Sequence, residues 1–210
     1  MKKVLAIGGL LLISVSACAF SSGIKGISLS GKVGYSYLLY AKESFRAVTG
    51  SPGGFIYGAG AKVDLPYGLF LTGGVDYFKK SGSRVFVSGS KIFRTDIPLT
   101  SSILAVTAGG GYQLYRKEKF SPYVGGGMGF FRYQETSQAK VSIPKFEMNK
   151  VSFFLLFGLE FLKRSRMSFS VEGRWTYLPN MIGEGGVSHY YGEDNLGGMS
   201  LFFSFNYRLK

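Results

Sequence analysis

The sequence predicts an all-β chain, an eight-stranded antiparallel up-and-down transmembrane β-barrel. Three observations predict this fold. Apolar residues alternate with small or polar residues at a period of two, in segments of about ten residues, which is typical of strands that cross a membrane. After residue 20, no apolar run reaches the roughly 18 residues that a membrane-spanning helix needs. The connections between the segments are alternately long and short.

The first 19 residues are predicted to be a signal peptide that precedes a barrel domain over residues 20–210. Two lysines are followed by a short apolar stretch, and Ala17-Cys18-Ala19 supplies the small residues of a cleavage site. Cys18 is the only cysteine, so cleavage leaves a mature chain without a thiol. The residues before Cys18 also resemble a lipobox, which leaves lipidation of Cys18 as an alternative.

The first three expected strands have one apolar or aromatic face and one small or polar face. In the first strand, over residues 27–39, Val33 and Tyr35 alternate with Lys32 and Gly34. The same rhythm predicts the second strand over 55–65 and the third over 69–77. The apolar faces of these two strands consist of Phe55, Tyr57, Ala59, Ala61, Val63 and Leu65, and of Leu69, Leu71, Val75 and Tyr77.

The fourth and fifth expected strands are rich in glycine, and their facing is less regular. The fourth presents an apolar face of Leu104, Val106, Ala108 and Tyr112, whereas the facing of the fifth, over 123–133, stays open. Glycine in a barrel strand permits tight curvature and leaves room for a large neighbour. It could also leave a lateral gap between these two strands.

The last three expected strands return to a regular alternation over residues 151–161, 167–177 and 199–209. In the sixth strand, Phe153, Leu155 and Phe157 alternate with Ser152 and Gly158. In a membrane barrel the apolar faces point outward to lipid, and closure of the sheet satisfies every backbone group. A soluble barrel would instead need a charged exterior, which these strands do not offer.

The connections predict which end of the barrel is which. Long connections are expected at 40–54, 79–98, 134–150 and 178–197, and short ones at 66–68, 115–121 and 163–166. Short periplasmic turns, longer outside loops and an even number of strands are typical of outer-membrane barrels. Both termini of the barrel are therefore expected in the periplasm.

The polar faces carry a balanced set of charges that would point into the lumen. They are Lys32, Lys62, Arg174 and Arg208 with Asp64, Asp76, Glu160 and Glu172. Buried charges persist when they are paired and hydrogen-bonded. We therefore expect a salt-bridge network that fills a narrow lumen, and a narrow ion pathway along the same residues is the alternative.

The second long connection is basic and is a possible surface-binding loop. Its cations are Lys79, Lys80, Arg84, Lys91 and Arg94. Such a loop could contact lipopolysaccharide phosphates or an anionic glycan, or it could be a solvated face beside anionic headgroups. The net charge of +13 is dispersed along an exported chain, so a nucleic-acid partner is not expected.

A catalytic constellation is not evident, and we expect a protein that is not an enzyme and needs no metal or other cofactor. The single histidine, His189, lies in the last long connection beside Ser188 and ahead of Glu193 and Asp194. A lipid A-modifying hydrolase remains a remote alternative on these residues. Adjacent residues on a strand face opposite sides, so Ser188 is poorly placed as a nucleophile for His189.

Three segments of the chain carry a family resemblance, namely 121–129 (SPYVGGGMG), 157–161 (FGLEF) and the closing segment 196–209 (LGGMSLFFSFNYRL). In these segments the chain resembles the small outer-membrane β-barrel superfamily, which includes the OmpA transmembrane domain, OmpX, OmpW and the opacity-type proteins. The resemblance implies an integral protein of the outer membrane of a Gram-negative-type bacterium that is inserted by the barrel-assembly machinery. Family members usually end on an aromatic residue, whereas this chain ends on Lys210.

The sequence thus predicts a monomeric outer-membrane protein whose partners are membrane lipid and lipopolysaccharide. Its expected role is structural or one of surface display, through membrane integrity, loop-mediated binding or adhesion. A narrow porin-like channel for small or apolar solutes is the alternative. Fold alone does not decide between these roles.

Overall fold

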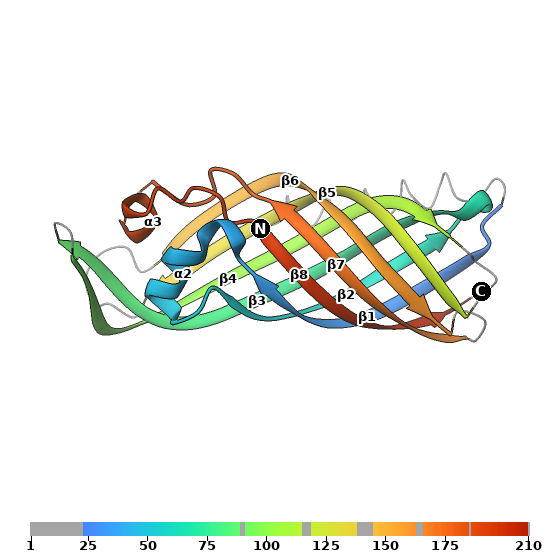
Figure 1. Cartoon of the computed structure of the whole chain (residues 1–210), viewed down its shortest axis with the longest axis horizontal. Helices are drawn as coiled ribbons and strands as arrows, with labels where there is room; N and C mark the ends of the chain where they lie inside the picture. The colour runs from blue at the N-terminus through green and yellow to red at the C-terminus, as the bar shows by residue number, and fades with distance from the viewer. Residues whose placement is uncertain are drawn as a thin grey trace.

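Eight antiparallel strands form one closed ring in the computed structural model, with each strand paired to the next and β8 paired back to β1 (Figure 1). The predicted fold class is confirmed. The structure describes residues 23–88, 91–114, 119–137, 145–162, 166–184 and 186–209, and the predicted signal peptide with Cys18 lies outside these ranges. The strands are β1 (Gly26–Tyr37), β2 (Gly53–Asp64), β3 (Leu69–Ser88), β4 (Lys91–Gln113), β5 (Phe120–Ser137), β6 (Lys145–Phe161), β7 (Met167–Tyr177) and β8 (Gly198–Arg208).

The outer surface of the ring is apolar, because the strands turn the predicted faces outward. Leu155 is 54% exposed, whereas its neighbour Leu156 is 2% exposed and points into the barrel. A closed barrel with an apolar outer band is the arrangement that lipid requires. Other strongly exposed members of this band are Phe55, Tyr57, Phe120, Val124, Met128, Val151, Phe157 and Phe203.

The two ends of the barrel differ. We call the end with the three short connections the turn end. There β1 begins and β8 ends, and Ser28 pairs with Arg208 in the ladder. Tyr67, in the 3-10 turn η2 (Pro66–Gly68), and Tyr207 are exposed at this end. The opposite end, where Tyr37 and Tyr77 are exposed, is the loop end. Exposed aromatic residues at both ends are typical of membrane interfaces.

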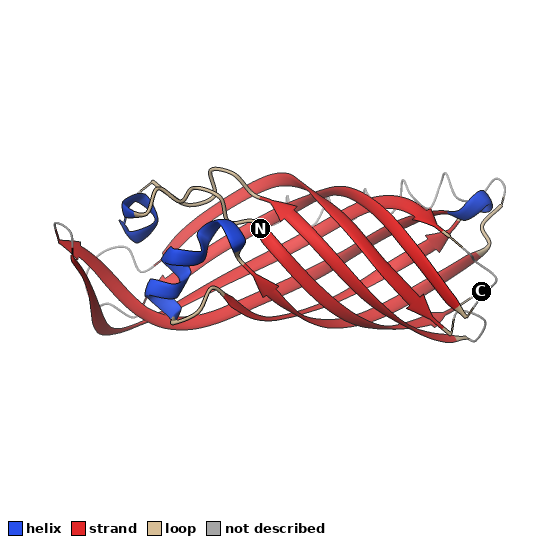
Figure 2. Ribbon diagram, in the orientation of Figure 1, coloured by secondary structure: helices blue, strands red, loops and turns tan. Residues whose placement is uncertain are grey.

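The loop end carries the two α-helices, and the short helical turn at the opposite end is η2 (Figure 2). The β1–β2 connection contains the 3-10 turn η1 (Leu39–Ala41) and the helix α2 (Lys42–Thr49), and the β7–β8 connection contains α3 (Gly186–Tyr190). The sequence did not predict α2, because eight residues are too few for a sustained helical period. None of the described helices is long and apolar enough to cross a membrane.

Two of the expected long connections are largely strand, so the prediction of loops there was wrong. β3 runs on to Ser88 and β4 starts at Lys91, and this hairpin projects beyond the rest of the barrel (Figure 1). The register shifts between Ser83 and Val85, so the regular alternation is lost. Likewise β5 and β6 extend through 137 and from 145 into the expected loop.

The glycine-rich strands leave no lateral gap. β4 and β5 pair continuously from Leu99 with Ser137 to Gln113 with Tyr123, so the expectation of an opening here was wrong. The glycines make room inside the barrel instead. A Cβ atom on Gly111 would lie 2.6 Å from the Phe70 ring, a contact that a real Cβ does not make. Large aromatic side chains therefore fill the lumen beside these glycines.

Candidate functional site

The middle of the lumen is crossed by a cluster of ion pairs centred on Arg174. Its guanidinium group donates to Asp76 at 2.5 Å and to Glu172 at 2.7 Å, and Lys32 lies 2.8 Å from the other oxygen of Asp76. Tyr123 donates a hydrogen bond of 3.2 Å to Glu172. The arginine guanidinium suits this place because its planar fork can contact two carboxylates at once.

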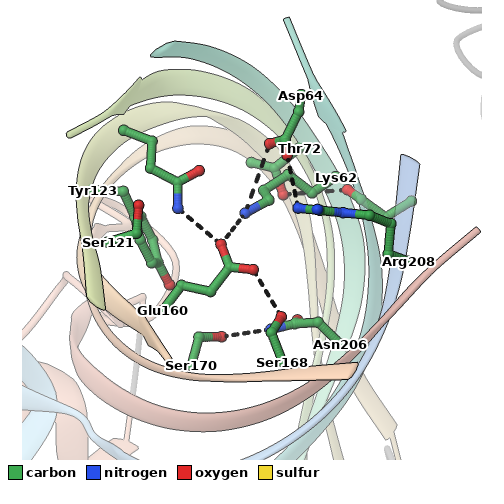
Figure 3. A network of polar contacts seen from close by, with 12 residues as sticks. Lys62, Asp64, Thr72, Ser121, Tyr123, Glu160, Ser168, Ser170, Asn206 and Arg208 are labelled. Atoms are coloured by element: carbon green, nitrogen blue, oxygen red, sulfur yellow. Dashed lines mark hydrogen bonds and ion pairs between the residues drawn. The ribbon is translucent and has the colours of Figure 1, made fainter. Parts of the chain in front are cut away.

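A second cluster lies toward the turn end and is centred on Glu160 (Figure 3). Its carboxylate accepts hydrogen bonds from Lys62 at 2.6 Å, from Gln113 at 2.8 Å and from Ser168 at 2.8 Å. Arg208 lies 3.4 Å from Asp64 in the same cluster. Glu160 is buried, and each of its oxygens has a donor, which is the condition for a stable buried carboxylate.

These two clusters contain all eight residues named from the sequence as lumenal charges, namely Lys32, Lys62, Asp64, Asp76, Glu160, Glu172, Arg174 and Arg208. The space left between them is a cavity of about 50 Å³, lined by residues such as Lys62, Tyr123 and Glu172. That volume holds a water molecule or two. The described side chains therefore fill the part of the lumen that contains the Arg174 and Glu160 clusters.

An apolar layer closes the lumen toward the loop end. Phe78, Phe131 and Tyr133 point inward from the strands, and all three are buried. Side chains of the two helix-bearing connections pack onto them, and Phe45 of α2 contacts Phe78 with a ring-centroid distance of 6.5 Å. Met181 of the β7–β8 connection is fully buried in the same layer. The connections thus form a lid over the barrel.

Helix α2 is attached at its N-terminus by a carboxylate from the other connection. Glu193 accepts hydrogen bonds from the backbone N–H groups of Glu43 at 3.0 Å and Ser44 at 2.9 Å, and from the Ser44 hydroxyl at 2.5 Å. The first N–H groups of a helix have no partner inside the helix and favour an anion. Glu193 therefore acts as an N-terminal cap supplied from 150 residues away.

The C-terminal end of α2 is held by cations of the β3–β4 hairpin. Arg94 donates to the carbonyl of Ala47 at 2.8 Å and to that of Arg46 at 2.9 Å. Lys80 donates to the Ser51 carbonyl at 2.9 Å and also to the Gly53 carbonyl. Arg94 therefore contacts the last turn of the helix, and Lys80 holds the chain just after it. Cations near the C-terminal end of a helix stabilise that end.

The five basic residues proposed from the sequence as a surface-binding loop therefore have different roles. Lys80 and Arg94 hold the lid. Lys79 and Lys91 are exposed on the hairpin, as a surface contact would require. Arg84 is half-buried, and its guanidinium lies 5.8 Å from the centre of the Phe86 ring. The structure does not bring the five together as one basic patch.

Above the apolar layer, the loop end contains a cavity of about 820 Å³. Pockets of about 300–1,000 Å³ that are mainly apolar with a few polar groups are typical of small-molecule sites. The wall comes from α2, the β3–β4 hairpin, β5, β6 and the β7–β8 connection. Its apolar side chains are Phe45, Val48, Val85, Phe86, Val87, Leu99, Tyr133, Phe146, Ile182, Val187 and Tyr190.

One half-buried carboxylate lies in this wall. Glu135 faces the cavity from the end of β5, beyond Arg132, whose side chain pairs with Glu147 at 2.7 Å on the outside of the barrel. The Tyr133 hydroxyl donates a hydrogen bond to Glu135. Burial raises the pKa of Glu135 above its usual range, and this hydrogen bond and the positive charge of Arg84 lower that pKa only in part. Arg84 also lines the cavity but forms no ion pair with Glu135.

Of the residues of the hydrolase alternative, Ser188 and His189 line the same cavity, whereas Glu193 and Asp194 do not. His189 Nδ1 lies 3.2 Å from the Gly183 carbonyl, and the Ser188 hydroxyl accepts a hydrogen bond from the Gly183 N–H. The carboxylate of Glu193 is engaged by α2. Within the described ranges, the acidic, histidine and cysteine side chains form no group that could hold a metal ion.

Sequence reasoning missed Glu135, the capping role of Glu193 and the cavity. A signal for Glu135 was present, since Phe131, Tyr133 and Glu135 continue the inward parity of β5. The strand was expected to end at 133, which left Glu135 in a loop. Nothing in the sequence around Glu193 indicates that it caps a helix about 150 residues earlier. That contact depends on the closure of the ring.

Comparison with solved structures agrees with this architecture. Neisserial surface protein A superposes with a TM-score of 0.51 at 14% identity, over 90% of this chain and 99% of that chain. A major outer membrane protein from Thermus thermophilus gives 0.51 at 12% identity, over 87% and 99% of the two chains. The chain has the fold of the small outer-membrane β-barrels. This confirms the family resemblance at the level of fold, and with the apolar outer band it indicates an outer-membrane location.

A third neighbour is Ail, the attachment invasion locus protein of Yersinia pestis, in complex with the heparin analogue sucrose octasulfate. It gives a TM-score of 0.50 at 12% identity and covers 89% of this chain and 100% of that chain. No protein-family model and no curated protein matches the sequence. Identities this low relate the folds and leave the role to be argued from the site.

Proposed function

We propose that this protein is a non-conducting, non-enzymatic outer-membrane barrel that binds a small ligand at its loop end. The observation that carries the proposal is the contrast along the barrel axis. Ion pairs and aromatic rings fill the lumen, whereas a cavity of about 820 Å³ lies between the lid and the β3–β4 hairpin. A filled lumen with a preformed cavity above it suits binding at the surface better than passage through the barrel.

The proposal places the loop end outside the cell, and the turn end with both termini of the barrel in the periplasm. Short turns at the end where β1 begins and β8 ends support this orientation. Lys91→Cys at the hairpin and Tyr67→Cys in the η2 turn give a direct test. A membrane-impermeant maleimide added to intact cells should label the first variant and not the second. Labelling of the Tyr67→Cys variant alone would show that the barrel has the opposite orientation in the membrane.

A test of the sealed lumen is the permeability of liposomes that contain the refolded protein. We expect vesicles that retain ions and small sugars as well as protein-free vesicles do, while vesicles with a general porin leak. The double variant Arg174→Ala and Asp76→Ala removes the central ion pair and is the control for a lumen opened on purpose. Rapid leakage through the wild-type protein would favour the narrow-channel alternative, with the charged clusters as its filter.

Ligand binding in the cavity can be tested by filling it. Val187 lies in the wall, so Val187→Trp should block uptake of an apolar fluorescent dye. Phe93 is exposed on the hairpin and is not part of the wall, so Phe93→Trp is a matched control that should bind as the wild type does. Equal dye binding by all three proteins in nanodiscs would show that the cavity is not the site.

The exposed lysines of the hairpin support a second contact, with an anionic partner. Lys79 and Lys91 remain free of the lid contacts that occupy Lys80 and Arg94. Ail, a neighbour in fold, is seen with a heparin analogue. Lipopolysaccharide phosphates are the nearest anions to an outer-membrane hairpin, and Lys79→Gln with Lys91→Gln should weaken retention on lipopolysaccharide, more at low salt than at high salt.

The non-enzymatic assignment rests on the separate engagements of His189, Ser188 and Glu193 described above. His189→Ala is expected to leave the lipid A mass spectrum of the host cell unchanged. A new or lost acyl chain would instead support the hydrolase. The proposal includes insertion by the barrel-assembly machinery. It also includes a monomeric state, because the described strands close the ring within one chain.

A further inference from the structure

Glu135 differs from the carboxylates in the lumen in what surrounds it. Asp76, Glu160 and Glu172 each lie within 2.8 Å of a cationic nitrogen. Glu135 accepts its side-chain hydrogen bond from the neutral hydroxyl of Tyr133 and forms no ion pair with the described residues. Removal of a carboxylate from water without a cation is unfavourable, so its place in a cavity wall suggests that a ligand provides the cation.

Two aromatic rings flank the same carboxylate. Phe146 is the direct partner of Glu135 in the β5–β6 ladder, and its ring centre lies 6.2 Å from that of Tyr133. Both rings line the cavity. Aromatic faces attract cations and repel anions, so the rings and the carboxylate favour the same charge.

Arg84 does not supply the missing charge. It lies close enough to lower the pKa of Glu135, but its guanidinium lies over the ring of Phe86 and no ion pair forms. An anionic head group drawn to Arg84 would approach Glu135 as well, and the two negative charges would repel each other. A neutral molecule would leave Glu135 without a cation.

We propose that the loop-end cavity binds a primary amine with an apolar body, whose ammonium group pairs with Glu135 while its body contacts the apolar wall. This inference rests on the proposed function and names the ligand class. A free alkyl or aryl amine from the medium and the ethanolamine head group of a lipid share this chemistry. The remaining wall, which includes Phe86, Ile182 and Val187, would accept the hydrocarbon portion of either.

The test compares three probes with the same six-carbon chain, namely hexylamine, hexanol and hexanoate. Each is titrated by calorimetry at neutral pH into the refolded protein in phosphatidylcholine nanodiscs. We expect hexylamine to bind more tightly than hexanol, and hexanoate to show the weakest binding. Glu135→Gln keeps the shape of the side chain and should weaken hexylamine binding about tenfold or more, with hexanol unchanged.

Glu184→Gln is the matched control, because Glu184 also lines the cavity but is exposed. It removes the same charge from the same wall and should leave hexylamine binding within about twofold of wild type. Heat-modifiable migration on gels shows whether each variant is folded. An equal loss of hexylamine affinity in both variants would mean that the net negative charge of the wall attracts the amine, and it would overturn the specific pairing with Glu135.

The outcomes separate the two proposals. Binding of all three probes with equal affinity would overturn the amine inference and keep the apolar cavity as a binding site. No binding of any probe to a folded protein would count against both. A repeat in phosphatidylethanolamine nanodiscs distinguishes the sources, since weaker hexylamine binding there indicates that the lipid head group occupies the same place.

Discussion

The lumen and the loop-end cavity both contain carboxylates, but only those in the lumen form ion pairs with cationic side chains of the protein. Glu160 in the lumen accepts hydrogen bonds from a lysine, a glutamine and a serine. Glu135 in the cavity has a tyrosine hydroxyl and an arginine that does not reach it. The difference separates charges that stabilise the barrel from a charge that is available to a ligand.

The largest expected effect comes from breaking the paired side of this comparison. Arg174→Met should destabilise the barrel by about 3–5 kcal/mol, because it leaves Asp76 and Glu172 without their arginine in a buried site. Urea unfolding in micelles, followed by the fluorescence of Trp175, measures the change.

The control for this variant is an ion pair outside the lumen. Arg132 and Glu147 form a partly exposed pair, so Arg132→Met should cost about 0–1 kcal/mol. Similar losses in Arg174→Met and Arg132→Met would mean that the lumenal pairs do not carry the stability assigned to them.

A second prediction tests the wall that separates the lumen from lipid. Leu155 faces outward near the middle of β6, so Leu155→Arg should cost about 2–4 kcal/mol on folding into a bilayer. Tyr67→Arg, at the exposed η2 turn, should fold normally. Unimpaired insertion of Leu155→Arg would contradict the outward facing of this strand and, with it, the inward facing of the charges.

A smaller and local effect is expected at the lid between the two regions. Glu193→Ala removes the acceptor of the first N–H groups of α2 and should cost about 1–2 kcal/mol. Hydrogen exchange of residues 42–49 should accelerate, while the strand amides keep their protection. Asp194→Ala, at the exposed neighbour, should change neither; unchanged exchange in Glu193→Ala would show that the cap does not hold the helix.

The smallest effect concerns Glu135 itself. Burial raises its pKa in the folded protein, so the folded state favours the protonated form. The favourable contribution of the Glu135 carboxyl to folding stability is fully present below the ordinary glutamate pKa of about 4.3. This contribution is lost as the pH rises through the raised pKa of the folded state. Glu135→Gln should therefore raise the melting temperature slightly at neutral pH.

This gain in Glu135→Gln should shrink as the pH falls, because the wild-type carboxyl becomes neutral as well. Melting temperatures of the two proteins in micelles, at several values between pH 4 and pH 8, measure the difference. A melting temperature that falls at neutral pH in the variant would mean that Glu135 is stabilised by a partner inside the protein, and the comparison with the lumen would no longer hold.

The sequence by itself determined the barrel and the charges within it. A period of two, ten-residue segments and an apolar face on each strand suffice to place Leu155 outside and Asp76 inside, because lipid requires an apolar exterior at every level of the membrane. The same alternation along the strands identified the eight inward-facing charged residues, which form ion pairs in the structure. The sequence could not say which cation pairs with which anion where the partners come from different strands, as Lys62 and Glu160 do.

Beyond the membrane the sequence no longer alternates between apolar and polar residues, so only the tertiary structure shows how the loop end is built. The β3–β4 hairpin no longer has to be apolar on its outer face, so its alternation disappears although its strands continue to Ser88 and from Lys91. Helix α2 depends on Glu193, Arg94 and Lys80, which the closed ring brings together from three other parts of the chain. The cavity, and the position of Glu135 in its wall without an ion pair, arise from the same long-range packing, which no local pattern encodes.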